Sequence, residues 1–77
     1  MGVVLVRFKP QVSYDDIKAL LDKLDARVMD HAGHICQWTL WVPDENGTRV
    51  LRSIDFLKNS GLIEWAEPDY IFNAHNY

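Results

Sequence analysis

The residues best suited to chemistry lie toward the C-terminal end of this 77-residue chain. Glu67 and Asp69 flank a proline, and a short segment then leads to an aromatic last residue, Tyr77. Carboxylates at a strand end can accept hydrogen bonds from the free amides of a partner, and an aromatic ring beside a terminal carboxylate can fill a pocket. We therefore expect recognition chemistry here, with a solvated turn and a frayed terminus as the plain alternatives.

Catalysis by the chain itself finds no support among its motifs. It has no Gly-x-Ser-x-Gly turn for a nucleophilic serine and no glycine-rich phosphate loop. His31 and His34 share a polar stretch that we expect to be a turn, and a pair of histidines supplies too few ligands for a metal ion. Cys36 has no cysteine partner and is expected to be a small buried residue. We predict no enzyme activity, no cofactor and no metal.

Composition and charge narrow the class of protein further. The chain is 48% hydrophobic and 25% charged with a net charge of −3, which is typical of a folded globular domain and not of a disordered one. Its basic residues are scattered, which argues against nucleic acid as a partner. No run approaches the about 18 apolar residues of a membrane span, and the start lacks the features of a signal peptide.

The clearest helix pattern begins at Ser13, whose hydroxyl can cap the free amides of the first turn. Asp15 and Asp16 follow, where the helix dipole favours negative charge. A second helix is expected over Thr48–Ser60, with Gly61 ending it. The apolar stripes that should face the core are Ile17, Leu20, Leu21 and Leu24 in the first helix, and Val50, Leu51, Ile54 and Leu57 in the second.

Four segments have the composition of strands. They are Val3–Phe8, Ala26–Asp30, Ile35–Val42 and Leu62–Ala66, and in the third of them Cys36, Trp38, Leu40 and Val42 should share one face. With the helices, the order is βαββαβ. We therefore predict an α+β, ferredoxin-like sandwich: a four-stranded antiparallel sheet with two helices on one face and a C-terminal tail. Residues 1–72 are expected to form the domain, and residues 73–77 the tail.

Two helices can cover only one face of such a sheet, yet the strands place bulky residues on both faces. Val3 and Leu5 alternate with the core-facing residues of the first strand, and Thr39 and Trp41 do so in the third. Contiguous exposed apolar area marks interaction surfaces, so these residues are candidates for an interface. Scattered surface residues without a role, or a homodimer through the sheet, are the alternatives.

Motifs at both ends of the pattern resemble those of a known family. Ile63–Tyr70 (IEWAEPDY) is similar to the V-x-Y-x-E-P-[ND]-Y signature near the end of the propeptides of subtilisin-like serine proteases. Val4–Pro10 (VLVRFKP) resembles the first-strand motif of these propeptides. The helix after Pro10 and the run Leu57–Leu62 (LKNSGL) are similar as well, so the resemblance spans the chain.

This resemblance implies an intramolecular chaperone and temporary product-like inhibitor of a subtilisin-like serine protease catalytic domain, or a stand-alone inhibitor of that type. In the family, the open face of the sheet packs on two parallel surface helices of the protease. Acidic side chains cap the N-termini of those helices, and by motif position they would be Glu67 and Asp69 here. The tail lies in the protease cleft as a bound product, and its residues would be Ala74, His75, Asn76 and Tyr77.

The resemblance implies Tyr77 as the residue in the primary specificity pocket. The corresponding segment is shorter in the bacterial subtilisin propeptide, and that shorter register would place His75 there instead. The protein would be a monomer when free. It would be secreted as part of a protease precursor whose signal peptide lies outside this chain, or it would be a cytoplasmic stand-alone inhibitor. The alternative from a different class is a ferredoxin-like regulatory or oligomerisation module that self-associates through its open sheet face.

Overall fold

A computed structural model describes residues 2–43 and 48–69 of the chain. The predicted tail, residues 73–77, therefore lies outside the described residues. In chain order the elements are β1 (Gly2–Phe8), α1 (Tyr14–Lys23), β2 (Arg27–Ala32), a short 3-10 helix (Gly33–Ile35), β3 (Gln37–Val42), α2 (Arg49–Asn59) and β4 (Ile63–Pro68).

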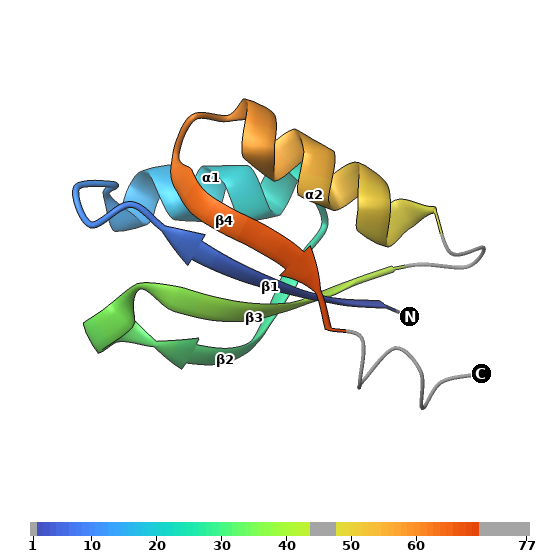
Figure 1. The fold of residues 1–77 in the computed structure, drawn as a ribbon, viewed down its shortest axis with the longest axis horizontal. Helices are drawn as coiled ribbons and strands as arrows, with labels where there is room; N and C mark the ends of the chain where they lie inside the picture. Colours follow the sequence, from blue (N-terminus) through green and yellow to red (C-terminus); the bar gives the residue numbers. More distant parts are fainter. Residues whose placement is uncertain (1, 44–47, 70–77) are drawn as a thin grey trace.

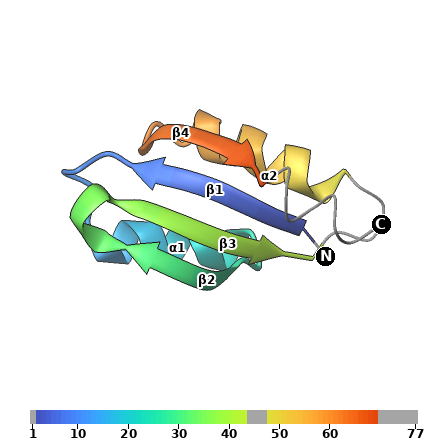
Figure 2. The same ribbon diagram turned by 60° about the horizontal axis from the view of Figure 1, so that its bottom comes forward.

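The strands form one antiparallel sheet in the order β2-β3-β1-β4. Figure 1 shows α1 and α2 together on one side of this sheet, and Figure 2 shows the opposite face turned toward the reader. The first and last strands are neighbours, so β1 lies between β3 and β4. The predicted α+β ferredoxin-like sandwich is confirmed. Within the described residues, no helix is long and apolar enough to cross a membrane.

The start of α1 follows from its first residues, as predicted. The Ser13 hydroxyl accepts a hydrogen bond from the Asp16 amide at 3.2 Å, which satisfies one of the amides that a helix start leaves free. Asp15 and Asp16 occupy the first turn, where they complement the helix dipole. The predicted stripe of Ile17, Leu20, Leu21 and Leu24 is buried against the sheet.

The second helix departs from the prediction at one position. Val50, Ile54 and Leu57 are buried, but Leu51 is 60% exposed and Ser53 is buried in its place. Successive helical residues are rotated by about 100°, so the arc that contains positions 50, 54 and 57 includes 53 and leaves 51 outside. Gly61 follows the helix at φ 76°, the left-handed conformation of a glycine after a helix end, as predicted.

The core lies between the sheet and the helices. Phe8, Leu40 and Leu57 are its largest fully buried members, contributed by β1, β3 and α2. The ring of Phe8 meets the ring of Trp38 edge to face, with centroids 6.2 Å apart. One face of β1 and one face of β3 therefore supply most of the sheet's buried surface, while the helices supply the other layer.

The segment between β2 and β3 differs from the predicted polar turn. His31 belongs to β2, Gly33–Ile35 form a 3-10 turn, and Cys36 adopts the left-handed conformation at φ 56° before β3 begins. Cys36 is therefore half-buried and outside the strand, whereas it was predicted to be a buried member of the strand face. The cause is the 3-10 turn, which Cys36 ends as its C-cap residue, so that β3 begins only at Gln37.

Candidate protein-binding site

The face of the sheet opposite the helices, called the open face below, is the candidate site (Figure 2). The pairing registers and the alternation of strand side chains assign residues from all four strands to it. They are Val3, Leu5 and Arg7 of β1, Gln37, Thr39 and Trp41 of β3, Arg27 and Asp30 of β2, and Trp65 and Glu67 of β4.

The predicted interface residues meet at the centre of this face. Leu5 lies directly across from Thr39, and Val3 lies across from Trp41. Leu5, Thr39 and Trp41 are half-buried, so each keeps surface available to a partner. Val3 is only 1% exposed, although it is not part of the core cluster under the helices. It therefore presents almost none of its own surface.

An arginine lies over a tryptophan at two places on the open face. The guanidinium carbon of Arg7 is 5.8 Å from the centroid of the Trp65 ring, and that of Arg27 is 5.8 Å from the centroid of the Trp41 ring. A cation over an indole is attracted by the electrons of the ring, and the contact limits the freedom of the long arginine side chain. Tryptophan and arginine are also the residues enriched at the energetic centres of protein interfaces.

These pairs were not predicted from the sequence. Arg7 follows Leu5 on the same face of β1, so alternation alone was a usable signal for placing it there. Its contact with Trp65 depends on the register between β1 and β4, which shifts at Arg7 and Phe8. Because Glu64 is the extra residue at this shift, Trp65 and not Glu64 lies across from Arg7. No motif in the sequence indicates such a bulge.

The acidic residues at the end of β4 lie at the edge of the open face. Glu67 is exposed and lies across from Leu5. Asp69 follows the strand, and its amide donates a hydrogen bond of 3.0 Å to the Val3 carbonyl. Residues separated by two positions in an extended chain project to the same side, which places both carboxylates beside the central cluster. Ala74, His75, Asn76 and Tyr77 lie outside the described residues.

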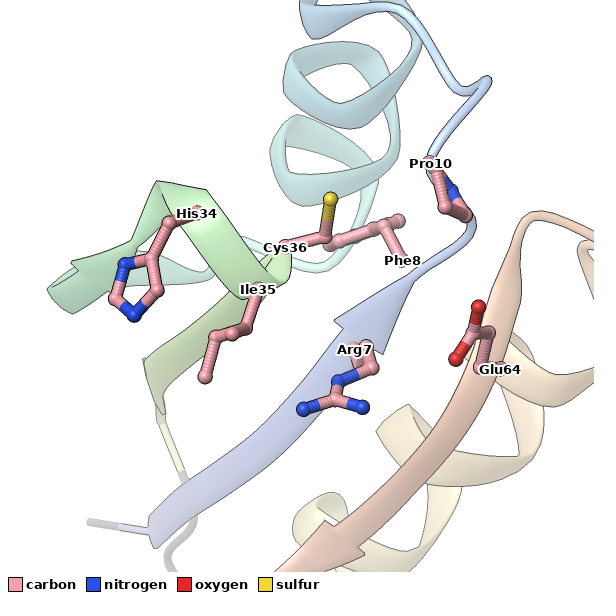
Figure 3. Close-up of a pocket in the computed structure, with 7 residues that line it drawn as sticks. All are labelled: Arg7, Phe8, Pro10, His34, Ile35, Cys36 and Glu64. Carbon is pink, nitrogen blue, oxygen red and sulfur yellow. The ribbon is translucent and has the colours of Figure 1, made fainter.

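A pocket of about 240 Å³ adjoins the open face where β1 ends (Figure 3). Arg7, Glu64 and Ile35 are among its lining residues, and His34 lies at the side away from Glu64 in the figure. In residues 2–43 and 48–69 there is no cluster of three or more side chains that could hold a metal ion. The pocket offers charged and apolar groups for binding.

No family model matches this sequence, and no curated protein or solved structure is similar enough to count as a match. A function for this domain must therefore be inferred from the open face, the carboxylates beside it and the pocket. All of them are suited to contact with another protein.

Proposed function

We propose that this domain binds and inhibits a subtilisin-like serine protease through its open face, as a propeptide or as a stand-alone inhibitor of the propeptide type. The observation that carries the proposal is the sheet face opposite the two helices, on which half-buried Leu5, Thr39 and Trp41 lie side by side. A surface of this kind gains free energy when a partner removes it from water. The class of partner is proposed from the resemblance of the β1 and β4 segments to motifs of subtilisin propeptides.

The carboxylates of Glu67 and Asp69 suit the second part of the proposal. They lie at the edge of the same face, so helices that pack on the face would have their N-termini within the reach of these side chains. A helix N-terminus has unpaired amides and a partial positive charge. A carboxylate placed there contributes about 0.3–1 kcal/mol, and up to about 2 kcal/mol where the site is partly buried.

The residues that follow β4 complete the proposed mode of inhibition. Ala74 to Tyr77 would enter the substrate cleft as a product whose new carboxylate remains in place. A peptide delivered by a folded domain loses less conformational entropy on binding than the same peptide free in solution. The chain would then act first as a folding template for its protease and afterwards as a temporary inhibitor, or only as an inhibitor if it is made separately.

The test measures binding to a panel of subtilisin-like proteases in which the catalytic serine has been replaced by alanine. Trp41→Ala should raise the Kd roughly tenfold or more, equivalent to about 1.4 kcal/mol, because it removes the largest ring on the central cluster. The matched control is Leu51→Ala, which removes an exposed apolar side chain from α2, one of the helices on the opposite side of the sheet. This control should bind like the wild type.

Sedimentation of the free domain separates this proposal from self-association. A monomer that binds one of the proteases supports the inhibitor. A tight dimer that binds none of them would overturn it and would assign the open face to a second copy of the chain. Trp41→Ala would then convert the dimer to a monomer.

A further inference from the structure

Arg7 is an unneutralised cation on the central strand β1. Its Nε is buried and has no hydrogen-bond partner. Within the part of the chain that the structure describes, Arg7 forms no ion pair, and its contact is the indole of Trp65 at 5.8 Å. A buried donor without an acceptor costs about 1–3 kcal/mol, and a charged one costs more. The buried Nε is closed to an incoming group, so a partner's acceptor would pair with the η nitrogens of this guanidinium.

The pocket described above, called the Arg7 pocket below, lies beside this guanidinium. Figure 3 shows the η nitrogens of Arg7 between Ile35 on one side and Glu64 on the other, and all three residues line the pocket. Phe8 and Pro10 contribute apolar surface. Its volume of about 240 Å³ is below the roughly 300–1,000 Å³ of sites that enclose small-molecule ligands. The space suits a single side chain.

We propose that the Arg7 pocket receives an aspartate or glutamate side chain of the protein that docks on the open face. The inference rests on the proposed function, because it takes that protein to be the protease. A carboxylate can accept parallel hydrogen bonds from a guanidinium, which is the strongest common pairing between charged side chains. Docking would also exclude water from the pocket, which strengthens the pair.

Glu64 offers the opposite chemistry, since its carboxylate could attract a basic side chain. Glu64 is exposed on the edge strand β4, so its charge is already well solvated. An ion pair at such a position contributes little. Arg7 is half-buried on a central strand, so its charge is less solvated than that of Glu64 and gains more from a partner. The pocket is therefore selective for an acid, with Glu64 opposing it weakly.

The experiment compares variants with opposite expected effects against the protease panel described above. Arg7→Met keeps the aliphatic stem and should raise the Kd roughly tenfold or more, with a weaker dependence on salt. Glu64→Gln removes the opposing charge and should leave the Kd unchanged or lower it. Arg52→Met is the matched control, because it removes an exposed arginine from α2, on the opposite side of the sheet, and it should change the Kd less than about threefold.

The remaining outcomes separate this inference from the proposed function. If Trp41→Ala weakens binding but Arg7→Met does not, the protease still docks on the open face. The proposal that one of its acidic side chains enters the Arg7 pocket is then wrong. Weaker binding by Glu64→Gln would assign the pocket to a basic side chain and would also overturn the inference. A wild-type domain that binds no protease would overturn both proposals.

Two further variants guard against a change in fold. Arg7→Lys keeps the charge without the planar fork, so it should bind less tightly than wild type even if Arg7→Met fails to fold. Arg7→Glu should bind worst and should regain affinity when the facing acidic residue of the protease is changed to lysine. Failure of every acidic-to-lysine change on the docking surface to restore binding would contradict the pairing.

Discussion

The imidazole of His31 stacks on the indole of Trp38, with ring centroids 3.9 Å apart and planes inclined by 29°. The residues lie across from each other on β2 and β3. The indole of Trp38 also contacts the core, where it meets the ring of Phe8. β2 is an edge strand, exposed along most of its length and paired with β3, so this stack adds a side-chain contact to its backbone pairing.

Replacing His31 with alanine should therefore loosen β2 in particular. We expect the free energy of unfolding to fall by about 1 kcal/mol, the usual contribution of an aromatic pair beyond its buried area. Urea denaturation followed by tryptophan fluorescence measures this loss. His34→Ala is the control, since His34 is exposed in the 3-10 turn and should change stability by less than about 0.5 kcal/mol. Equal losses would show that the stack contributes nothing.

Substitutions of the serines at positions 53 and 60 should have opposite effects. The Ser53 hydroxyl is buried in α2 without a hydrogen-bond partner. Ser53→Ala removes this unsatisfied group and should raise the free energy of unfolding by about 1 kcal/mol. A thermal melt should register the gain as an increase of about 4–8 °C in Tm. A lower Tm would mean that the hydroxyl has an acceptor in solution.

Ser60 provides the contrast, because its hydroxyl donates to the Leu57 carbonyl at 2.6 Å and accepts from the Leu62 amide at 3.1 Å. These bonds close the end of α2 and begin the connection to β4. Ser60→Ala should therefore lower the free energy of unfolding by about 1 kcal/mol or more. The same melts compare both variants directly.

Gly61→Ala tests the conformation that ends α2. Gly61 has φ 76°, and an added Cβ would meet no atom within 4 Å. Any loss of stability is then due to backbone strain alone, which we expect to be about 1 kcal/mol. Gly61→Asn should lose less, because asparagine tolerates the left-handed region better than alanine. If both variants are as stable as wild type in denaturant, the helix end does not depend on this conformation.

The double substitution Glu67→Ala and Asp69→Ala tests the proposed contacts with helix N-termini. It should raise the inhibition constant roughly tenfold, since each carboxylate contributes about 0.3–1 kcal/mol or somewhat more when partly buried. Circular dichroism should show an intact domain. Loss of the fold would instead make these residues structural, and an unchanged inhibition constant would remove them from the interface.

Deleting His75–Tyr77 tests the proposed product-like tail. The inhibition constant should rise roughly tenfold or more, about 1.4 kcal/mol, because these residues make up most of the segment that would enter the cleft. Tyr77→Gly distinguishes the two registers of the tail. It should reproduce most of the loss if Tyr77 fills the specificity pocket, whereas His75→Gly should do so if the shorter register holds.

Much of the fold could be predicted from local patterns. Ser13 has the side chain that a helix start requires, and the apolar stripe after it has helical spacing, so α1 was placed correctly. Leu51 was placed wrongly because it is as apolar as its neighbours, and only the orientation of α2 on the sheet decides which arc is buried. The exposure of Leu51 depends on how α2 packs against the sheet, and it cannot be predicted from the hydrophobicity of the residue alone.

The candidate site was predictable in part. Alternation placed Leu5, Thr39 and Trp41 on one face, and the structure brings them together on adjacent strands. The Arg7 pocket was not predictable, because it depends on the bulge opposite Arg7 and on the turn that carries Cys36 in a left-handed conformation. Both features arise from how distant segments meet, for which periodicity has no signal.

The position of β1 between β3 and β4 affects how the sheet can form while the chain is being synthesised. β1 is synthesised before both of the strands that pair with it, β3 and β4. Of these, β4 is the last described element of the chain. A sheet that joins early and late segments forms slowly, since distant parts of the chain have to meet before their contacts stabilise it. During synthesis on the ribosome, β1 therefore stays without its full set of partners until β4 has emerged.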